Sequence, residues 1–420
     1  MSKNVIIDNG AYEIKYGEAS DDKPKHIPNC VVRTNTGRVL LGENLRPEKK
    51  VITDYSGIHY RRPIEHSQLT QWSLEKQIWD NTFMESHFTD NWLEDSNLIF
   101  CESPFTISKF QNMSDEILFE EYGIANLYRC SSGFLTPWLN NNEQKNEKSQ
   151  RNYNDFQFVI DSGFDSTWVI PMIYGLPYWK AVRKMPVAGK FLNGYMREMI
   201  SFRHYNVTDE MVVVNNIKEK ACYVSPNYEN SLGKVEKSRN GALDNKKTEE
   251  ISINYVLPDF KTSTVGYTLT NSELATLERK EEIQSLKLYD ERFAIPELLF
   301  HPELSGAYKA GLITTIKDSL NHVPELLRPL MVANMILVGG TSNLPGYEDR
   351  LVSDLKQEVP IDNKIIVRDL SNFTKDHSEI GWFSGRQFFK SGAFNKVCVS
   401  KHDYQELGVE YTQEKFGYKL

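Results

Sequence analysis

Three short apolar runs, each ending in a glycine turn, stand out in the pattern of hydrophobic and polar positions along the chain. They are Val5–Gly10 (VIIDNG), Phe158–Gly163 (FVIDSG) and Met335–Thr341 (MILVGGT). Short runs rich in β-branched and other apolar residues are typical of buried strands, and a glycine directly after them permits a tight turn. The pattern therefore predicts three buried strands that each end in a turn, two of them with the sequence Asp-x-Gly.

The remaining apolar pattern predicts a hairpin partner for the first strand and several helices. Residues 11–17 (AYEIKYG) alternate as a strand would. Trp72, Ile78, Trp79 and Phe83 fall near helical spacing, and we expect them to pack in the core. Further helices are expected over residues 114–122, 273–288, 312–320 and 347–355.

Two long polar stretches interrupt this pattern. Residues 140–154 (NNNEQKNEKSQRNYN) cannot bury enough apolar area to offset their chain entropy, which predicts a mobile loop. Because this stretch lies immediately before the second Asp-x-Gly strand, it is also the expected boundary between two lobes. Residues 227–247, rich in Asn, Lys, Glu and Ser, predict an exposed insertion.

The bulk properties narrow the class of protein. A chain of 420 residues is long for a single core, which favours two lobes. No apolar run approaches a membrane span and the N-terminus lacks signal-peptide order, so we expect an intracellular protein without membrane contact. Five scattered cysteines fit reduced thiols and no zinc site. The net charge of −8 argues against a general DNA-binding surface.

The two Asp-x-Gly turns suggest a nucleotide clamp. A nucleoside triphosphate bound with a divalent ion needs carboxylates for the metal, backbone amides for the phosphates and a cation to offset charge. We expect Asp8 and Asp161 to hold the metal ion through water and the turns at Gly10 and Gly163 to cradle the phosphates. Lys15 would supply the cation. The alternative is that these are ordinary hairpin turns, which is what a single Asp-x-Gly most often is.

The third turn is expected at the nucleoside end of the ligand. Gly339 and Gly340 lack side chains, so a flat ring can approach them, and Thr341 follows directly. A helix after this turn would add a favourable N-terminal dipole. With Ser162, which lies inside the second turn, these residues complete the predicted binding set.

Beyond the three turns, the chain resembles actin and the actin-related proteins over nearly its whole length. The matching stretches are 60–66 (YRRPIEH), 78–79 (IW), 187–192 (VAGKFL), 217–224 (IKEKACYV), 291–293 (ERF), 296–297 (PE) and 344–351 (LPGYEDRL). The resemblance implies an α/β, actin-like two-lobed ATPase fold, made of duplicated ribonuclease H-like domains with a nucleotide cleft between them. It also implies that Lys218 and Glu219 line the nucleoside pocket. The alternative is that these two form a surface pair on a helix.

The resemblance also implies a domain layout. Residues 1–154 are expected to form the first lobe, with a small subdomain at about 25–62. Residues 155–365 are expected to form the second lobe, with an inserted subdomain at about 188–306 and an exposed insertion at about 225–290. Residues 366–420 are expected to return to the first lobe.

Several positions depart from actin. Ala11 stands where actin has a serine that touches the terminal phosphate, followed by bulky Tyr12 in place of glycine, and Phe164 stands where actin has a second aspartate. Ser132 and Trp168 align with the glutamine and histidine that orient the attacking water in actin. Tryptophan cannot accept a proton, and a serine hydroxyl reaches less far than a glutamine amide. The sequence therefore predicts nucleotide binding without useful hydrolysis.

Within the family, some stretches are most similar to the actin-related protein 6 subfamily. They are residues 12–17 (YEIKYG), 201–206 (SFRHYN), 255–260 (YVLPDF), 327–331 (LRPLM) and 415–418 (KFGY). The resemblance implies a non-catalytic nuclear subunit of a Swr-type, ATP-dependent chromatin remodeller that exchanges a variant histone into nucleosomes. The implied partners are a Snf2-type motor ATPase and a small zinc-finger subunit, with nucleosomes reached through the complex. The implied cofactor is ATP or ADP with Mg²⁺ in a structural role, and the location is the nucleus, with the cytoplasm as a second compartment.

Two other function classes stay open. A filament-forming, actin-like cytoskeletal ATPase is disfavoured by the altered residues above. It is also disfavoured because the segment before Pro63, which carries an inter-subunit loop in actin, is shorter here, so a homopolymer is not expected. A metabolic kinase on the same scaffold would need a general-base carboxylate facing a phosphoryl acceptor, and no motif in the sequence supplies one.

Overall fold

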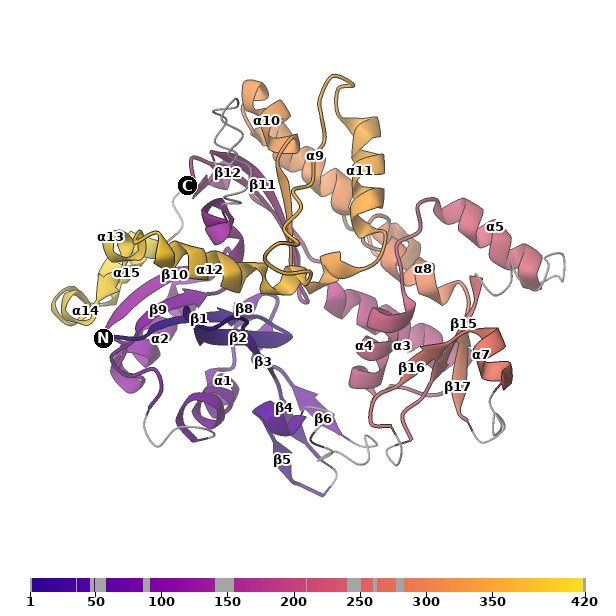
Figure 1. The fold of residues 1–420 in the computed structure, drawn as a ribbon, viewed down its shortest axis with the longest axis horizontal. Coiled ribbons are helices and arrows are strands. Elements are labelled where there is room, and N and C mark those ends of the chain that lie inside the picture. Colours follow the sequence, from indigo (N-terminus) through magenta and orange to yellow (C-terminus); the bar gives the residue numbers. More distant parts are fainter. Residues whose placement is uncertain are drawn as a thin grey trace.

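The computed structural model describes residues 2–34, 36–45, 49, 58–85, 91–139, 155–208, 210–239, 251–259, 263–276 and 283–417. The chain forms two lobes, each built on its own sheet (Figure 1). The predicted mobile loop, residues 140–154, lies outside the described residues. Within the described ranges, no helix is long and apolar enough to cross a membrane.

The first lobe contains a six-stranded sheet with strand order β19-β10-β9-β1-β2-β3. Its strands are β1 (Asn4–Asn9), β2 (Glu13–Glu18), β3 (Lys25–Pro28), β9 (Asn97–Cys101), β10 (Asn126–Cys130) and β19 (Val399–Ser400). β1 pairs antiparallel with β2 and parallel with β9. The apolar side chains of β1 are fully buried, as a strand covered on both faces requires.

The second lobe repeats this pairing. Its strands are β11 (Phe156–Ser162), β12 (Thr167–Ile173), β13 (Leu176–Pro177), β14 (Arg183–Met185) and β18 (Met335–Val338). β11 pairs antiparallel with β12 and parallel with β18, so it occupies the place that β1 has in the first sheet. The two Asp-x-Gly turns consequently follow equivalent central strands, one in each lobe.

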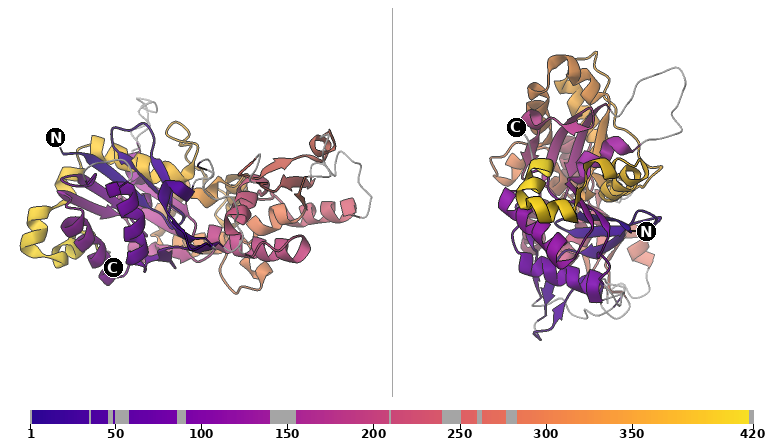
Figure 2. Two further views of the ribbon diagram at one scale, coloured as in Figure 1. Left: turned by 90° about the horizontal axis from the view of Figure 1, so that it is seen from below. Right: turned by 90° about the vertical axis from the view of Figure 1, so that its left-hand side faces the viewer.

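The C-terminal helices pack against the first lobe. They are α12 (Ile380–Lys390), α13 (Phe394–Val397), α14 (Lys401–Leu407) and α15 (Val409–Phe416), beside the earlier helices α1 (Trp72–Trp79) and α2 (Ser108–Glu116). α12 contacts β1, β19 pairs with β10 and α15 contacts α2. Both views of Figure 2 show these yellow helices beside the indigo and purple first lobe.

The second lobe carries the remaining helices and an inserted three-stranded sheet. These elements are α3 (Gly189–Arg203), α4 (Met211–Ala221), α5 (Tyr228–Arg239), α7 (Asn271–Thr276), α8 (Glu291–Glu297), α9 (Leu312–His322), α10 (Arg328–Val332) and α11 (Tyr347–Glu358), with β15 (Ile253–Val256), β16 (Tyr267–Leu269) and β17 (Ser285–Leu288). Tyr255, Leu286 and Leu288 of this sheet are fully buried in the second-lobe core. Part of the segment expected as an exposed insertion, about 225–290, is therefore packed against the lobe.

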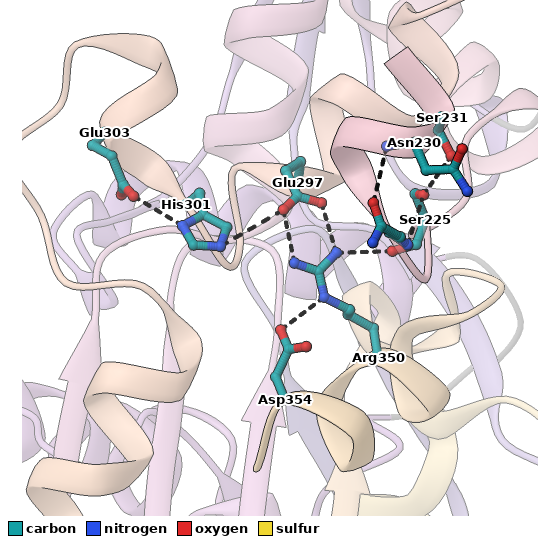
Figure 3. Close-up of polar contacts among 9 residues, drawn as sticks. Ser225, Asn230, Ser231, Glu297, His301, Glu303, Arg350 and Asp354 are labelled. Carbon is teal, nitrogen blue, oxygen red and sulfur yellow. Dashed lines mark hydrogen bonds and ion pairs between the residues drawn. The ribbon is translucent and has the colours of Figure 1, made fainter. Parts of the chain in front are cut away.

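A buried ion-pair network fixes the inserted subdomain to α11 (Figure 3). Arg350 donates to both carboxylate oxygens of Glu297 at 2.9 Å. It also donates to Asp354 Oδ2 at 2.7 Å and to the Ser225 carbonyl at 2.8 Å. Because Arg350 and Glu297 are both buried, each depends on the other for charge compensation.

The small subdomain of the first lobe is a three-stranded sheet, β5-β4-β6. Its strands are β4 (Val31–Arg33), β5 (Val39–Leu40) and β6 (His59–Arg61), and the two-stranded hairpin β7 (Ile64–Glu65) and β8 (Gln68–Leu69) follows. Cys30, Val32, Leu40 and Ile58 form a separate core beneath this sheet. The subdomain thus has its own apolar centre.

The aromatic residues predicted for the first-lobe core lie there, which confirms that prediction. Trp79 and Phe83 are fully buried, and the Trp79 ring contacts the rings of Phe83, Phe100 and Tyr122 edge-on, with centroids 5.6–5.8 Å apart. Edge-on pairs of this kind add to the stabilisation from area burial. Trp72, 7% exposed, packs at the margin of this cluster.

Two secondary-structure predictions were wrong. The helix expected over 114–122 begins earlier, at Ser108, and passes into a π-helical turn at Ile117. The helix expected over 273–288 ends at Thr276 among the described residues, and Ser285–Leu288 is a strand. The stretch expected as an exposed insertion at 227–247 begins with helix α5, and residues 227–238 are mostly exposed, as expected, while residues 240–250 lie outside the described ranges.

Candidate functional site

A cavity of about 530 Å³ lies between the two lobes, at the ends of β1, β11 and β18. Ten of the eleven predicted binding residues line it, from both lobes and from the inserted subdomain. They are Asp8, Gly10, Lys15, Asp161, Gly163, Lys218, Glu219, Gly339, Gly340 and Thr341. The volume is in the range of small-molecule and cofactor sites.

The first turn brings a carboxylate and an amine together. Asp8 pairs in register with Lys15 across the β1–β2 hairpin, and Lys15 Nζ lies 4.0 Å from Asp8 Oδ2. A Cβ on Gly10 would lie 2.6 Å from the Glu13 carbonyl oxygen, so this turn has no room for a side chain. Asn29 Nδ2 donates to the Gly10 carbonyl at 3.0 Å, and this hydrogen bond stabilises the turn.

In the second turn, Asp161 and Ser162 face opposite ways, as neighbouring residues of a strand do. Asp161 lines the cavity, and burial together with the charge of Asp8 raises its pKa to about 7. Ser162 is fully buried, and its hydroxyl shares hydrogen bonds with the hydroxyls of Thr167 and Tyr347. Ser162 is therefore the one predicted residue whose side chain does not reach the cavity.

The third turn packs tightly on the second. Gly339 has a φ of +90°, and a Cβ there would lie 2.3 Å from the Ser162 carbonyl oxygen. Thr341 Oγ1 donates to the Gly163 carbonyl at 2.6 Å. The element that follows is a 3₁₀ turn, Gly340–Asn343, and α11 begins only at Tyr347. The expected helix dipole directly after the glycines is thus absent.

Helix α4 supplies the far wall of the cavity. Lys218 is 6% exposed, which rules out the alternative of a solvated surface lysine, while Glu219 is exposed at the cavity. Burial lowers the pKa of Lys218 to about 8. Lys218 Nζ donates to Asn215 Oδ1 at 3.0 Å, and Asn215 Nδ2 donates to Glu219 Oε1 at 2.7 Å. Sequence reasoning missed Asn215, although its spacing of three and four residues from this pair places all three on one helix face.

Other lining residues were missed for lack of any local signal. Asn343 ends the 3₁₀ turn after Gly339, and Asp376 and Ser378 belong to a second short 3₁₀ turn, His377–Glu379, with Asp376 as its N-cap. Asn343 Nδ2 donates to Asp376 Oδ1 at 2.7 Å, which ties these segments together beside the third turn. Only the folded chain brings them to the site.

The two positions aligned with the water-orienting residues of actin both face the cavity. Ser132 Oγ donates to Asp8 Oδ1 at 2.7 Å, so this hydroxyl is hydrogen-bonded to a residue predicted to hold the metal ion. Trp168 is 7% exposed, and the Lys184 amine lies 5.3 Å from its ring centroid. The indole of Trp168 has no acceptor atom, and the Ser132 hydroxyl sits on a shorter side chain than a glutamine amide.

The charge of the cavity bears on which ligand fits. Seven carboxylates line it (Asp8, Glu13, Glu102, Asp161, Asp165, Glu219 and Asp376), against the amines of Lys15 and Lys218. A polyphosphate would be repelled unless a divalent cation came with it. Among the described residues no three His, Cys, Asp or Glu side chains cluster as metal ligands. The carboxylates of Asp8 and Asp161 are the residues that would hold a Mg²⁺ ion, through its bound waters.

Comparison with known proteins identifies the family of the chain. The actin family profile matches residues 1–417. The chain is 38% identical to Actin-like protein ARP6 of Candida glabrata over 99% of its own length and 98% of that protein. It is 36% identical to Actin-like protein ARP6 of Saccharomyces cerevisiae and 33% to that of Candida albicans, with the same coverage of both chains. These matches confirm the resemblance and the two-lobed fold class drawn from the sequence, and the chain belongs to the actin family.

Proposed function

We propose that this protein is a non-catalytic scaffold subunit of a nuclear, Swr-type ATP-dependent chromatin remodeller that exchanges a variant histone into nucleosomes. It would bind ATP or ADP with Mg²⁺ for structural support and hydrolyse it little or not at all. The relatives named Actin-like protein ARP6 and the subfamily stretches of the sequence support the assignment to this class of complex.

The observation that carries the non-catalytic part is the pair of residues at the water-orienting positions. An in-line water needs a hydrogen-bond acceptor held within reach. Trp168 has only an N–H donor, and the short side chain of Ser132, whose hydroxyl is bonded to Asp8, reaches less far than a glutamine amide. Loss of an oriented water costs orders of magnitude in rate.

The binding residues have separate tasks in this proposal. Asp8 and Asp161 would hold Mg²⁺ through water, and Lys15 would offset phosphate charge. The turns at Gly10 and Gly163 would present backbone amides, and Gly339 and Gly340 would face the nucleoside. When bound, the metal nucleotide supplies only binding energy, which raises the stability of the closed protein by mass action.

A single-turnover assay on purified protein tests this. Calorimetry should detect binding of Mg-ATP, while phosphate release should stay near the uncatalysed rate. An Asp161→Asn variant should weaken binding and serves as the control for the site. Phosphate release at the rate of actin would refute the non-catalytic assignment.

The assembly is tested by tagging the protein at its own locus and measuring its native size in nuclear extract. We expect elution far above the 48.6 kDa of the chain, together with a Snf2-type motor, a small zinc-finger subunit and histones. Elution as a monomer, or pelleting as filaments with Mg²⁺ and ATP, would instead favour the cytoskeletal alternative.

A further inference from the structure

Two aromatic side chains meet across the cleft. Tyr12 follows the first turn, in the first lobe, and Phe164 follows the second turn, in the second lobe. Their ring centroids are 4.9 Å apart at an interplanar angle of 47°. The two rings are in direct van der Waals contact and join the lobes through side chains alone.

Arg62 covers both rings. Its Cζ lies 4.7 Å from the centroid of Tyr12 and 5.0 Å from that of Phe164. Its Nη1 donates to the carbonyls of Ala11 and Tyr12, and to that of Asn29, at 2.9–3.2 Å. These bonds hold the guanidinium on the first lobe, so its contact with Phe164 is a second link between the lobes.

The Tyr12 hydroxyl provides a third link. It accepts a hydrogen bond from Asn215 Nδ2 at 2.8 Å, and Asn215 lies on α4 of the inserted subdomain. Asn215 in turn accepts from Asn193 Nδ2 at 2.9 Å and from Lys218 Nζ at 3.0 Å. The tyrosine therefore spans the cleft from the β1–β2 hairpin to a fixed hydrogen-bond network.

A separate set of contacts closes the same cleft from the β7–β8 hairpin. Ser67 Oγ lies 2.6 Å from Ser166 Oγ and 3.1 Å from Asp165 Oδ2. Lys184 Nζ donates to the His66 carbonyl at 2.8 Å. The first lobe thus contacts the second at two places.

From these contacts we propose that Tyr12, Phe164 and Arg62 form a latch that keeps the two lobes closed when no nucleotide is bound. In this arrangement the ring contact bridges the two glycine turns directly. Closure then does not depend on a ligand's phosphates. The inference goes beyond the proposed function, because it concerns the protein without nucleotide and outside the complex.

Hydrogen–deuterium exchange on the full chain tests the latch. The protein is stripped with EDTA and an ATP-hydrolysing enzyme, and exchange of the β7–β8 hairpin, residues 64–69, is compared with and without Mg-ADP. This hairpin contacts the second lobe through Ser67 and the His66 carbonyl and holds none of the predicted nucleotide-binding residues. We expect wild-type exchange rates to agree within about twofold. In a Tyr12→Ala/Phe164→Ala double variant, exchange in the stripped protein should rise at least tenfold, and Mg-ADP should restore it.

Controls separate closure from folding. Residues 126–130 of β10 lie away from the cleft and should exchange alike in every sample. Tyr12→Phe removes only the bond to Asn215 and should raise exchange less than the double variant does. Tyr404→Phe removes a comparable bond, to Glu120 inside the first lobe, and should leave exchange of the hairpin unchanged.

Fast exchange of this hairpin in stripped wild-type protein, slowed only by Mg-ADP, would overturn the latch. Failure to bind Mg-ADP would count against the proposed function, yet the contrast between stripped wild type and stripped double variant would still decide the latch. If the double variant does not fold, Tyr12→Phe and the wild-type comparison decide it.

Discussion

Gly339 and Gly340 are neighbours with different tolerance for a side chain. A Cβ on Gly339 would meet the Ser162 carbonyl oxygen at 2.3 Å, and its φ of +90° is unfavourable for other residues. A Cβ on Gly340 would meet only the Ser378 Cβ, at 3.7 Å, which is ordinary contact. We expect Gly339→Ala to destabilise the protein by roughly 1–3 kcal/mol and Gly340→Ala by much less. Thermal unfolding of both variants checks this, and equal shifts would contradict it.

Glu75 gives the protein a pH-dependent stability. It is fully buried behind the first turn, where Trp79 Nε1 donates to its carboxyl oxygen at 3.0 Å. Burial raises its pKa from 4.5 to about 7. As the pH rises, the Glu75 carboxyl loses its proton in the unfolded state before it does in the folded state. The contribution of Glu75 to the free energy of unfolding is therefore full below pH 4.5 and is lost as the pH rises to about 7.

The corresponding variant is Glu75→Gln, which cannot ionise. Relative to wild type it should gain up to roughly 3 kcal/mol between pH 5 and pH 8, because it avoids burying a charge. Unfolding midpoints measured across this range provide the check. Parallel pH curves for the two proteins would show that Glu75 does not titrate as inferred.

At this scale, sequence reasoning found the residues that belong to a local pattern. Asp8, Gly10 and Lys15 share one hairpin, so a short window places them together. It missed Asn215. It wrongly included the Ser162 side chain, because which face of a strand points into the core is known only when the position of that strand in the sheet is known. The roles of these residues in nucleotide binding stay predictions.

Among the elements, the Arg350 network is the strongest polar connection between α8 and α11. Removing one partner of a buried pair leaves the other charge uncompensated, at a cost of roughly 3–5 kcal/mol. Arg350→Ala should therefore lower the unfolding temperature clearly. Lys317→Ala, which breaks an exposed pair with Glu358, should cost less than about 1 kcal/mol. Calorimetry on both variants makes the comparison, and similar losses would argue against a structural role for the network.

Element prediction succeeded where the apolar period was unambiguous and failed where tertiary contacts decided the outcome. The three strands that end in glycine turns carry uninterrupted apolar runs, and all three are strands in the structure. Ser285–Leu288 was assigned to a charged helix, but pairing with β15 makes it a strand and buries Leu286 and Leu288. Such pairing partners lie too far apart in sequence for a local window to detect.

At the scale of the whole molecule, the duplicated lobe was predictable because the Asp-x-Gly strand occurs twice. The latch was not, since Tyr12 and Phe164 were visible only as departures from the actin pattern. Their contact joins residues far apart in the chain, and Arg62 reaches them from a third segment. Contacts between the lobes therefore could not be predicted from local sequence patterns and are known only from the structure.

Because the C-terminal segment packs on the first lobe, we expect a C-terminal truncation to disrupt that lobe. A chain ending at residue 379 lacks β19 and α12, which pack on β10 and β1. It should expose the apolar face of the first sheet and be recovered as aggregate. A chain ending at residue 417 keeps both elements and is the matched control. Size-exclusion chromatography compares them, and a soluble monomer from the shorter chain would contradict the expectation.

The same connectivity sets the order of events on the ribosome. Strands β1, β2, β9 and β10 emerge early, but α12 and β19 emerge only after the whole second lobe has been made. At ordinary synthesis rates this interval is on the order of tens of seconds. During this interval the apolar surface of the nascent first lobe stays exposed. We therefore expect this protein to need a chaperone until its last forty or so residues leave the exit tunnel.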